Sequence, residues 1–164
     1  METPMSEPNH PDGRVRIIFR LDPGEQQSYE TETLWAEPFG PNEFRILNSP
    51  FFVFGVSAED VVTAALRDHD VYEFKRVVEK GGHSTYRIFL RGDRTIADDC
   101  FRLRWTGIQS LGATFENGNG TFIAVDVPPS ANIRTIYQLL EQGENAGIWA
   151  FEEANFEAAA GRVP

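Results

Sequence analysis

The chain has little cysteine, little histidine and no long apolar run. Its single cysteine, Cys100, excludes an internal disulfide, which agrees with a reducing compartment. The three histidines, His10, His69 and His83, are scattered and have no zinc-ligand spacing. No segment reaches the roughly 20 apolar residues that a membrane helix needs, and the start of the chain lacks a secretory signal pattern. We therefore expect a cytoplasmic protein without a membrane segment, a metal site or a cofactor.

Positive charge is also scarce. There are 25 Asp and Glu residues against 15 Lys and Arg residues, which gives a formal net charge of −10. An acidic protein repels phosphate backbones and anionic membrane surfaces, so this charge argues against nucleic acid as a partner. The chain does have the material for a packed core, because 41% of its 164 residues are hydrophobic.

The first half of the chain has the pattern of short strands. Residues 1–13 contain three prolines and little to bury, and we predict a flexible leader there. From 14 to 82, short runs rich in β-branched and aromatic residues alternate with Pro, Gly and Asn turn residues. The strands are predicted at 15–21, 29–36, 43–47, 51–54, 61–66 and 71–78. This pattern indicates a small antiparallel β-sheet or barrel.

The pattern changes after Gly81 and Gly82, which we take as the boundary of a second subdomain. Residues 83–154 predict the order strand, helix, strand, strand, helix, strand, followed by a tail over 155–164. Within this half, the sequence Asn-Gly-Asn-Gly at 117–120 is typical of a β-hairpin turn. The order of elements is that of a ferredoxin-like (βαββαβ) half, so the predicted fold class is α+β.

The two predicted helices have apolar residues at intervals of three and four. The first, over 95–111, is expected to bury Ile96, Cys100, Leu103, Gly107 and Leu111. The second, over 132–141, is expected to bury Ile133, Ile136, Tyr137 and Leu140. Gly143 is then expected just beyond its end, and Cys100 is expected to be a buried, unreactive thiol.

The segment from His83 to Thr85 is the first candidate site. It places an imidazole and two hydroxyl groups, those of Ser84 and Thr85, where a glycine pair enters a strand. The alternative is structural, with His83 bonded to the backbone and Ser84 beginning the strand.

A second candidate is the aromatic run at 48–56, which contains Phe51, Phe52 and Phe54. In a strand these rings occupy both faces, so the strand is either buried on both sides or presents one face to a partner. Exposed aromatic residues among acids would suit a basic partner surface.

Three stretches, at 32–36, 48–62 and 82–87, resemble a bacterial family catalogued as a domain of unknown function, number forty-two sixty-five. The similarity extends through 125–128 and covers most of the chain after the leader. It implies no activity. It does mark a set of positions as typical of the family, for folding or for binding: Trp35, Asn48, Pro50, Gly55, Asp60, His83, Ser84 and Thr85.

These observations favour a non-enzymatic protein-binding module, of the immunity or regulatory kind, that covers a basic surface on its partner. The alternative is a small-molecule sensor or an enzyme with a pocket between the two halves near His83. No catalytic residue is predicted. RNA binding through Arg87 and Phe89 is a third hypothesis, which the net charge disfavours. The candidate binding residues are Trp35, Phe51, Phe52, Asp60, His83, Ser84 and Thr85.

Overall fold

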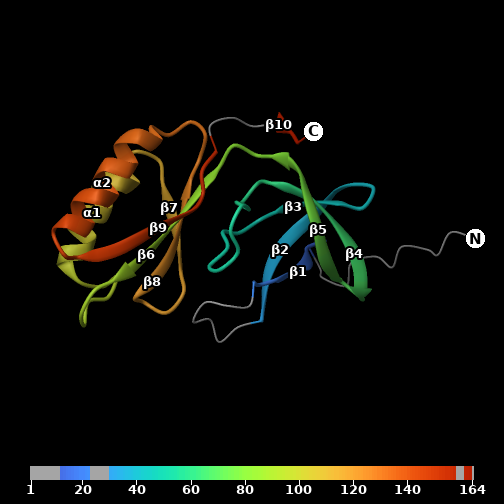
Figure 1. The fold of residues 1–164 in the computed structure, drawn as a ribbon, viewed down its shortest axis with the longest axis horizontal. Coiled ribbons are helices and arrows are strands. Elements are labelled where there is room, and N and C mark those ends of the chain that lie inside the picture. The colour runs from blue at the N-terminus through green and yellow to red at the C-terminus, as the bar shows by residue number, and fades with distance from the viewer. Residues whose placement is uncertain (1–11, 23–29, 158–160, 164) are drawn as a thin grey trace, which may run out of the picture.

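The structure, a computed structural model, describes residues 12–22, 30–157 and 161–163. The predicted leader over 1–13 therefore lies almost entirely outside the described residues. Ten strands and two helices are found in the described parts. Figure 1 shows them as three layers: two helices, a four-stranded sheet in the middle, and a larger sheet on the far side.

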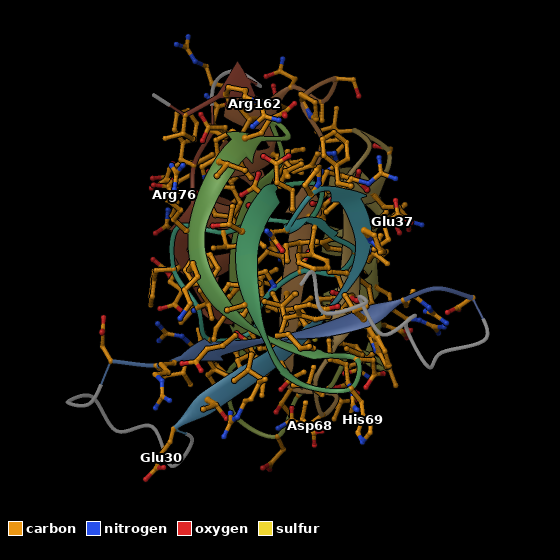
Figure 2. All side chains as sticks on the ribbon, turned by 90° about the vertical axis from the view of Figure 1, so that its right-hand side faces the viewer. Glu30, Glu37, Asp68, His69, Arg76 and Arg162 are labelled. Carbon is orange, nitrogen blue, oxygen red and sulfur yellow. The ribbon has the colours of Figure 1, made fainter. Side chains whose placement is uncertain are left out.

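The larger sheet is closed into a barrel. Its strands are β1 (Val15–Arg20), β2 (Thr31–Gly40), β3 (Glu43–Ile46), β4 (Val61–Asp68) and β5 (Val71–Lys80). Consecutive strands pair antiparallel, and β5 returns to pair with β1 in parallel. A short sixth strand, β10 (Gly161–Arg162), pairs antiparallel with the C-terminal end of β5, at Glu79 and Lys80. Figure 2 looks at the barrel from the side opposite the helices, with Arg162 at one end and Asp68 and His69 at the other.

Alternation along the strands fills the barrel. In β1, Val15, Ile17 and Phe19 are buried while the residues between them face outward. This is the period-two pattern of a strand with one apolar face. The barrel core is completed by Leu34, Ala36, Phe44, Ile46, Val56, Val62 and Ala64.

The four-stranded sheet has the order β7-β8-β6-β9, with every neighbouring pair antiparallel. Its strands are β6 (Ser84–Leu90), β7 (Thr114–Asn117), β8 (Phe122–Val127) and β9 (Trp149–Asn155). The predicted hairpin is confirmed, because β7 and β8 are joined through the Asn-Gly-Asn-Gly segment. The chain passes from the barrel to this sheet at Gly81 and Gly82, between β5 and β6.

The predicted fold class is wrong. The described chain is mostly β, with ten strands in sheets of six and four and only two helices, and not an α+β protein with a ferredoxin-like half. The physical reason lies on the face of the four-stranded sheet that points away from the helices. Thr85 and Arg87 on this face are fully buried, because the segment 47–58 covers it: Ser57 bonds Thr85, and the carbonyls of Phe52 and Val53 accept from Arg87. The sheet is thus a middle layer.

The strand predicted at 51–54 does not form, and this stretch is an irregular loop. The backbone N–H groups of Phe51, Phe52 and Val53 all donate to the carboxylate of Glu32, at 2.6, 3.1 and 2.9 Å. Three consecutive N–H groups that converge on one carboxylate cannot alternate between two neighbouring strands, as a ladder requires.

The first helix, α1 (Asp99–Gln109), buries a different face from the predicted one. It covers the sheet with Phe101, Trp105 and Ile108, whereas Leu103 is 78% exposed. Cys100 is only partly buried, so its predicted full burial is wrong. The helix begins late because Asp98 closes a turn before it, in which the carboxylate of Asp98 accepts from the backbone of Thr95 at 2.7 Å.

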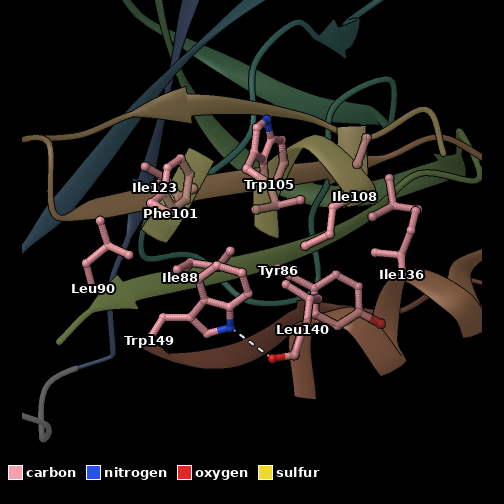
Figure 3. Packing of buried hydrophobic residues seen from close by; sticks show 13 residues of the cluster. Tyr86, Ile88, Leu90, Phe101, Trp105, Ile108, Ile123, Ile136, Leu140 and Trp149 are labelled. Carbon is pink, nitrogen blue, oxygen red and sulfur yellow. Dashed lines mark hydrogen bonds between the residues drawn. The ribbon is translucent and has the colours of Figure 1, made fainter. Parts of the chain in front are cut away.

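The second helix, α2 (Ile133–Asn145), continues past Gly143, which lies inside the helix and not after it. Ile136 and Leu140 enter the core as predicted, while Tyr137 is 38% exposed. Figure 3 shows the packing between sheet and helices, where the indole N–H of Trp149 donates to the carbonyl of Leu140 at 2.9 Å.

Candidate binding pocket

A pocket of about 230 Å³ lies where the segment 47–58 meets the four-stranded sheet, on the side away from the helices. Among the residues that line it are Asn48, Ser49, Glu59, His83, Glu116 and Asp126. One wall therefore comes from the irregular segment, and the other from the start of β6 and from the β7–β8 hairpin.

His83 and Asp126 form a bonded pair in this pocket. Nδ1 of His83 donates to the carboxylate of Asp126 and lies 3.0 and 2.9 Å from its two oxygens. Both side chains are less than one-fifth exposed. The burial of Asp126 raises the pKa of its carboxyl group, and the hydrogen bond from His83 opposes that rise. Asp126 thus fixes the orientation of the imidazole ring.

Glu116 supplies a second carboxylate. It accepts a hydrogen bond from the backbone N–H of Ser49 at 2.6 Å, which joins the hairpin to the irregular segment. Burial raises the pKa of Glu116, the Ser49 amide lowers it, and the charge of Asp126 raises it further. The two acids share a sheet face because Asp126 pairs with Thr114, two residues from Glu116.

Glu59 is the third acid of the pocket. Its backbone has φ 73°, a left-handed conformation that is uncommon for a residue other than glycine. Its charge contributes to the raised pKa of Asp126, so the two carboxylates act on one another. The pocket therefore combines three carboxylates and one imidazole.

The residues around this pocket lie within a region that matches a known family. Residues 32–151 match the family described as Domain of unknown function (DUF4265). The chain belongs to this family. The matched range contains all three acids of the pocket and His83, and the resemblance found in the sequence is confirmed.

A crystal structure described as that of a hypothetical protein from Neisseria gonorrhoeae resembles the DUF4265 chain with a TM-score of 0.74. The two are 17% identical, and the alignment covers 89% of this chain and 97% of the other. At that identity the likeness shows the fold alone. Among curated proteins, no relative matches the DUF4265 chain.

Of the candidate residues predicted from the sequence, His83 is placed at the pocket, whereas Thr85 and Asp60 belong to a buried network beside it. The hydroxyl groups of Thr85 and Ser57 are 2.6 Å apart. The Asp60 carboxylate accepts from the backbone N–H groups of Ser57 and Gly81, both at 2.9 Å, and from Lys80 Nζ at 3.2 Å. With these partners the network satisfies its own polar groups and joins the two sheets.

The other predicted residues of the DUF4265 chain also hold structure together. Ser84 Oγ accepts from the backbone N–H of Glu157 at 2.9 Å. The rings of Phe51 and Phe52 pack edge-on against Phe122 of β8, with centroids 5.4 and 5.8 Å away. The backbone N–H of Trp35 donates to the side chain of Asn48 at 2.8 Å.

The patch considered for RNA does not form either, because Arg87 is only 1% exposed. Sequence reasoning missed Glu59, and it also missed Glu116 and Asp126 of the hairpin strands. The hairpin signal placed both acids on neighbouring strands, and alternation along those strands could have placed them on one face. The approach of His83 depends on the pairing of β6 with β8, for which the sequence contains no local signal.

No described helix has the length and apolar character to cross a membrane. Within the described ranges, no group of three or more His, Cys, Asp or Glu side chains is arranged to hold a metal ion.

Proposed function

We propose that the protein is a non-enzymatic binding module, of the immunity or regulatory kind, whose pocket accepts a basic group of a partner protein. The observation that supports this best is that Glu59, Glu116 and Asp126 all line one small pocket, in which Glu59 Oε2 also lies 3.6 Å from Arg45 Nε. A guanidinium or ammonium group placed there would offset the repulsion among the carboxylates and donate hydrogen bonds to them.

The size of the pocket favours one side chain over a larger ligand. Its volume of about 230 Å³ is below the roughly 300–1,000 Å³ of typical small-molecule sites. The charge of the whole chain, −10, would in addition attract a basic partner from a distance and speed its association.

A second candidate, an enzyme or sensor that acts on a small amine, is favoured by the bonded pair of His83 and Asp126. A carboxylate that holds Nδ1 of a histidine leaves Nε2 available for proton transfer, as in general-base catalysis. The first candidate accounts for more of the pocket, because proton transfer by His83 does not require Glu59 or Glu116.

Nuclear magnetic resonance titration tests the proposal. The probe is N-acetylarginine methylamide, and the matched control is N-acetylcitrulline methylamide, which has nearly the same shape but no charge. We expect the arginine probe alone to shift the amide signals of Glu59, His83 and Glu116. The double variant E116Q/D126N should weaken this binding at least tenfold. Equal binding of both probes, or shifts confined to another surface, would overturn the proposal.

A further inference from the structure

We infer that the basic group arrives on an extended peptide segment of the partner, which adds a strand to the edge of β7. This inference rests on the proposed function and specifies its partner. In such an arrangement backbone hydrogen bonds supply much of the affinity, and a pocket for one side chain supplies the specificity.

β7 stands at one end of the four-stranded sheet and pairs with β8 on its inner side. In the described parts of the chain, the backbone of residues 114–116 makes no hydrogen bond outside this pairing. An edge strand with unpaired backbone groups is a template for a further strand.

The pocket lies beside this edge. Thr114, Phe115 and Glu116 are consecutive, and all three line the pocket. The ring of Phe115 points to the helix side, where it packs against Phe101 and Trp105 with centroids 5.9 and 4.9 Å away. What Phe115 presents to the pocket is therefore its backbone, so a strand paired with β7 would pass directly beside the carboxylates.

The opposite edge of the sheet differs. In β9 the backbone N–H of Phe151 donates to the carboxylate of Glu144 at 3.0 Å, and the carbonyl of Ala154 accepts from the backbone of Gly55 at 2.9 Å. Two backbone groups of β9 are thus already bonded outside the sheet, which protects this edge. Of the two edges, β7 is the one beside an acidic pocket.

The charge of the pocket identifies the peptide. The side chain that enters must pair with Glu116 and Asp126, so it is an arginine or a lysine. Its neighbours in the peptide need only adopt the extended conformation, to which β-branched residues are well suited.

The test uses the peptide acetyl-Thr-Val-Thr-Arg-Thr-Val-Thr-amide and the full chain. Two further peptides carry N-methyl groups on alternate residues, one at the odd and one at the even positions. In a strand only one of these sets faces β7, so we expect one methylated peptide to bind at least tenfold more weakly than the parent while the other keeps its affinity. Amide hydrogen exchange of Thr114–Asn117 should slow in the complex, and that of β9 should not change.

The outcomes separate the two proposals. If both methylated peptides bind like the parent and like the single arginine probe, the pocket function stands and the added strand is refuted. If neither the peptides nor the arginine probe bind, the proposed function itself fails. A peptide-independent dimer that protects β7, detected by light scattering, would show that a second copy of the chain occupies this edge and would overturn the inference.

Discussion

Glu32 and Arg87 are charged residues that hold the same loop from opposite sides. Glu32, from the barrel, accepts from the backbone N–H groups of Phe51, Phe52 and Val53. Arg87, from the four-stranded sheet, donates to the carbonyls of Phe52 and Val53 and to Glu152. Since this partly buried loop has no ladder to satisfy its backbone, these side chains replace the missing strand partners. The charges of Glu32 and Arg87 thus contribute to the fold through the hydrogen bonds that these side chains make.

Glu116 has a different effect, because its ionised form is disfavoured by burial, which raises its pKa. A carboxyl group with a pKa higher in the folded than in the unfolded chain makes folding more favourable as pH falls through the folded value. The full stabilisation is reached when the pH lies below the pKa of the group in the unfolded chain. At neutral pH, therefore, the ionised Glu116 lowers the stability of the fold.

The variant Glu116→Gln tests this sign. Glutamine keeps an oxygen that can accept from Ser49, but it does not titrate. At pH 7 we expect the variant to be at least as stable as the wild type in urea unfolding. The difference should move in favour of the wild type as the pH falls towards the ordinary range of glutamate. Glu30→Gln, at an exposed position, is the control for charge alone. A variant clearly less stable at pH 7 and unchanged at low pH would contradict this account.

At the scale of elements, the helix layer depends on how closely α2 approaches β9. A Cβ atom built on Gly143 would lie 2.2 Å from the ring of Trp149. The matched position in α1 is Gly107, where a Cβ atom would meet only Leu139 Cδ1, at 3.8 Å. Gly143 thus permits a close contact, whereas Gly107 is a helix residue with room for a methyl group.

The pair of variants Gly143→Ala and Gly107→Ala should therefore have opposite effects. We expect Gly143→Ala to lower the free energy of unfolding by about 1–3 kcal/mol or more, because the ring of Trp149 must move. Gly107→Ala should raise it by about 0.5–1 kcal/mol, through the better helix propensity of alanine. Urea unfolding followed by tryptophan fluorescence measures both. Equal effects of the two substitutions would rule out the close contact as the cause.

These elements also show what sequence reasoning could reach. The hairpin was predictable because Asn and Gly favour the turn locally, and the barrel strands because their alternation is local too. The predicted buried face of α1 was wrong because Leu103 lies at the same three- and four-residue spacing as the buried residues. A helical period alone does not select between overlapping faces. The loop at 51–54 has strand-like residues, but Glu32, nineteen residues away from Phe51 in sequence, captures its backbone.

At the scale of the whole molecule, the barrel and the sheet are joined at several points. Lys80 Nζ, at the end of β5, donates to Asn155 Oδ1 of β9 at 3.4 Å, and the hydroxyl groups of Ser57 and Thr85 lie 2.6 Å apart. The end of the chain returns from β9 to the barrel, where β10 pairs with β5 and Arg162 bonds Glu43 at 2.8 and 3.2 Å. The loop held by Glu32 and Arg87 fills the space between, so we expect barrel and sheet to unfold together.

The variant Arg87→Met tests this coupling. Methionine fills much of the same space, but it leaves the carbonyls of Phe52 and Val53 without their donor. Removing the Arg87 donor from two partly buried carbonyls should cost about 1–3 kcal/mol, because the partner carboxylate of Glu152 is 39% exposed and can be hydrated. Because the lost bonds are those between the sheet and the loop, the barrel and the sheet should then separate into two transitions.

Urea unfolding followed residue by residue with nuclear magnetic resonance distinguishes the two patterns. In the wild type, Ile17 of the barrel core and Ile88 of the sheet core should share one midpoint. In Arg87→Met their midpoints should differ. The control is Arg91→Met, an exposed arginine just past the end of β6, which should change neither the midpoint nor the number of transitions. If Arg87→Met lowers stability but both residues still unfold together, the coupling resides in the bonds around Asp60 and in the return of β10, and not in the loop that Arg87 holds.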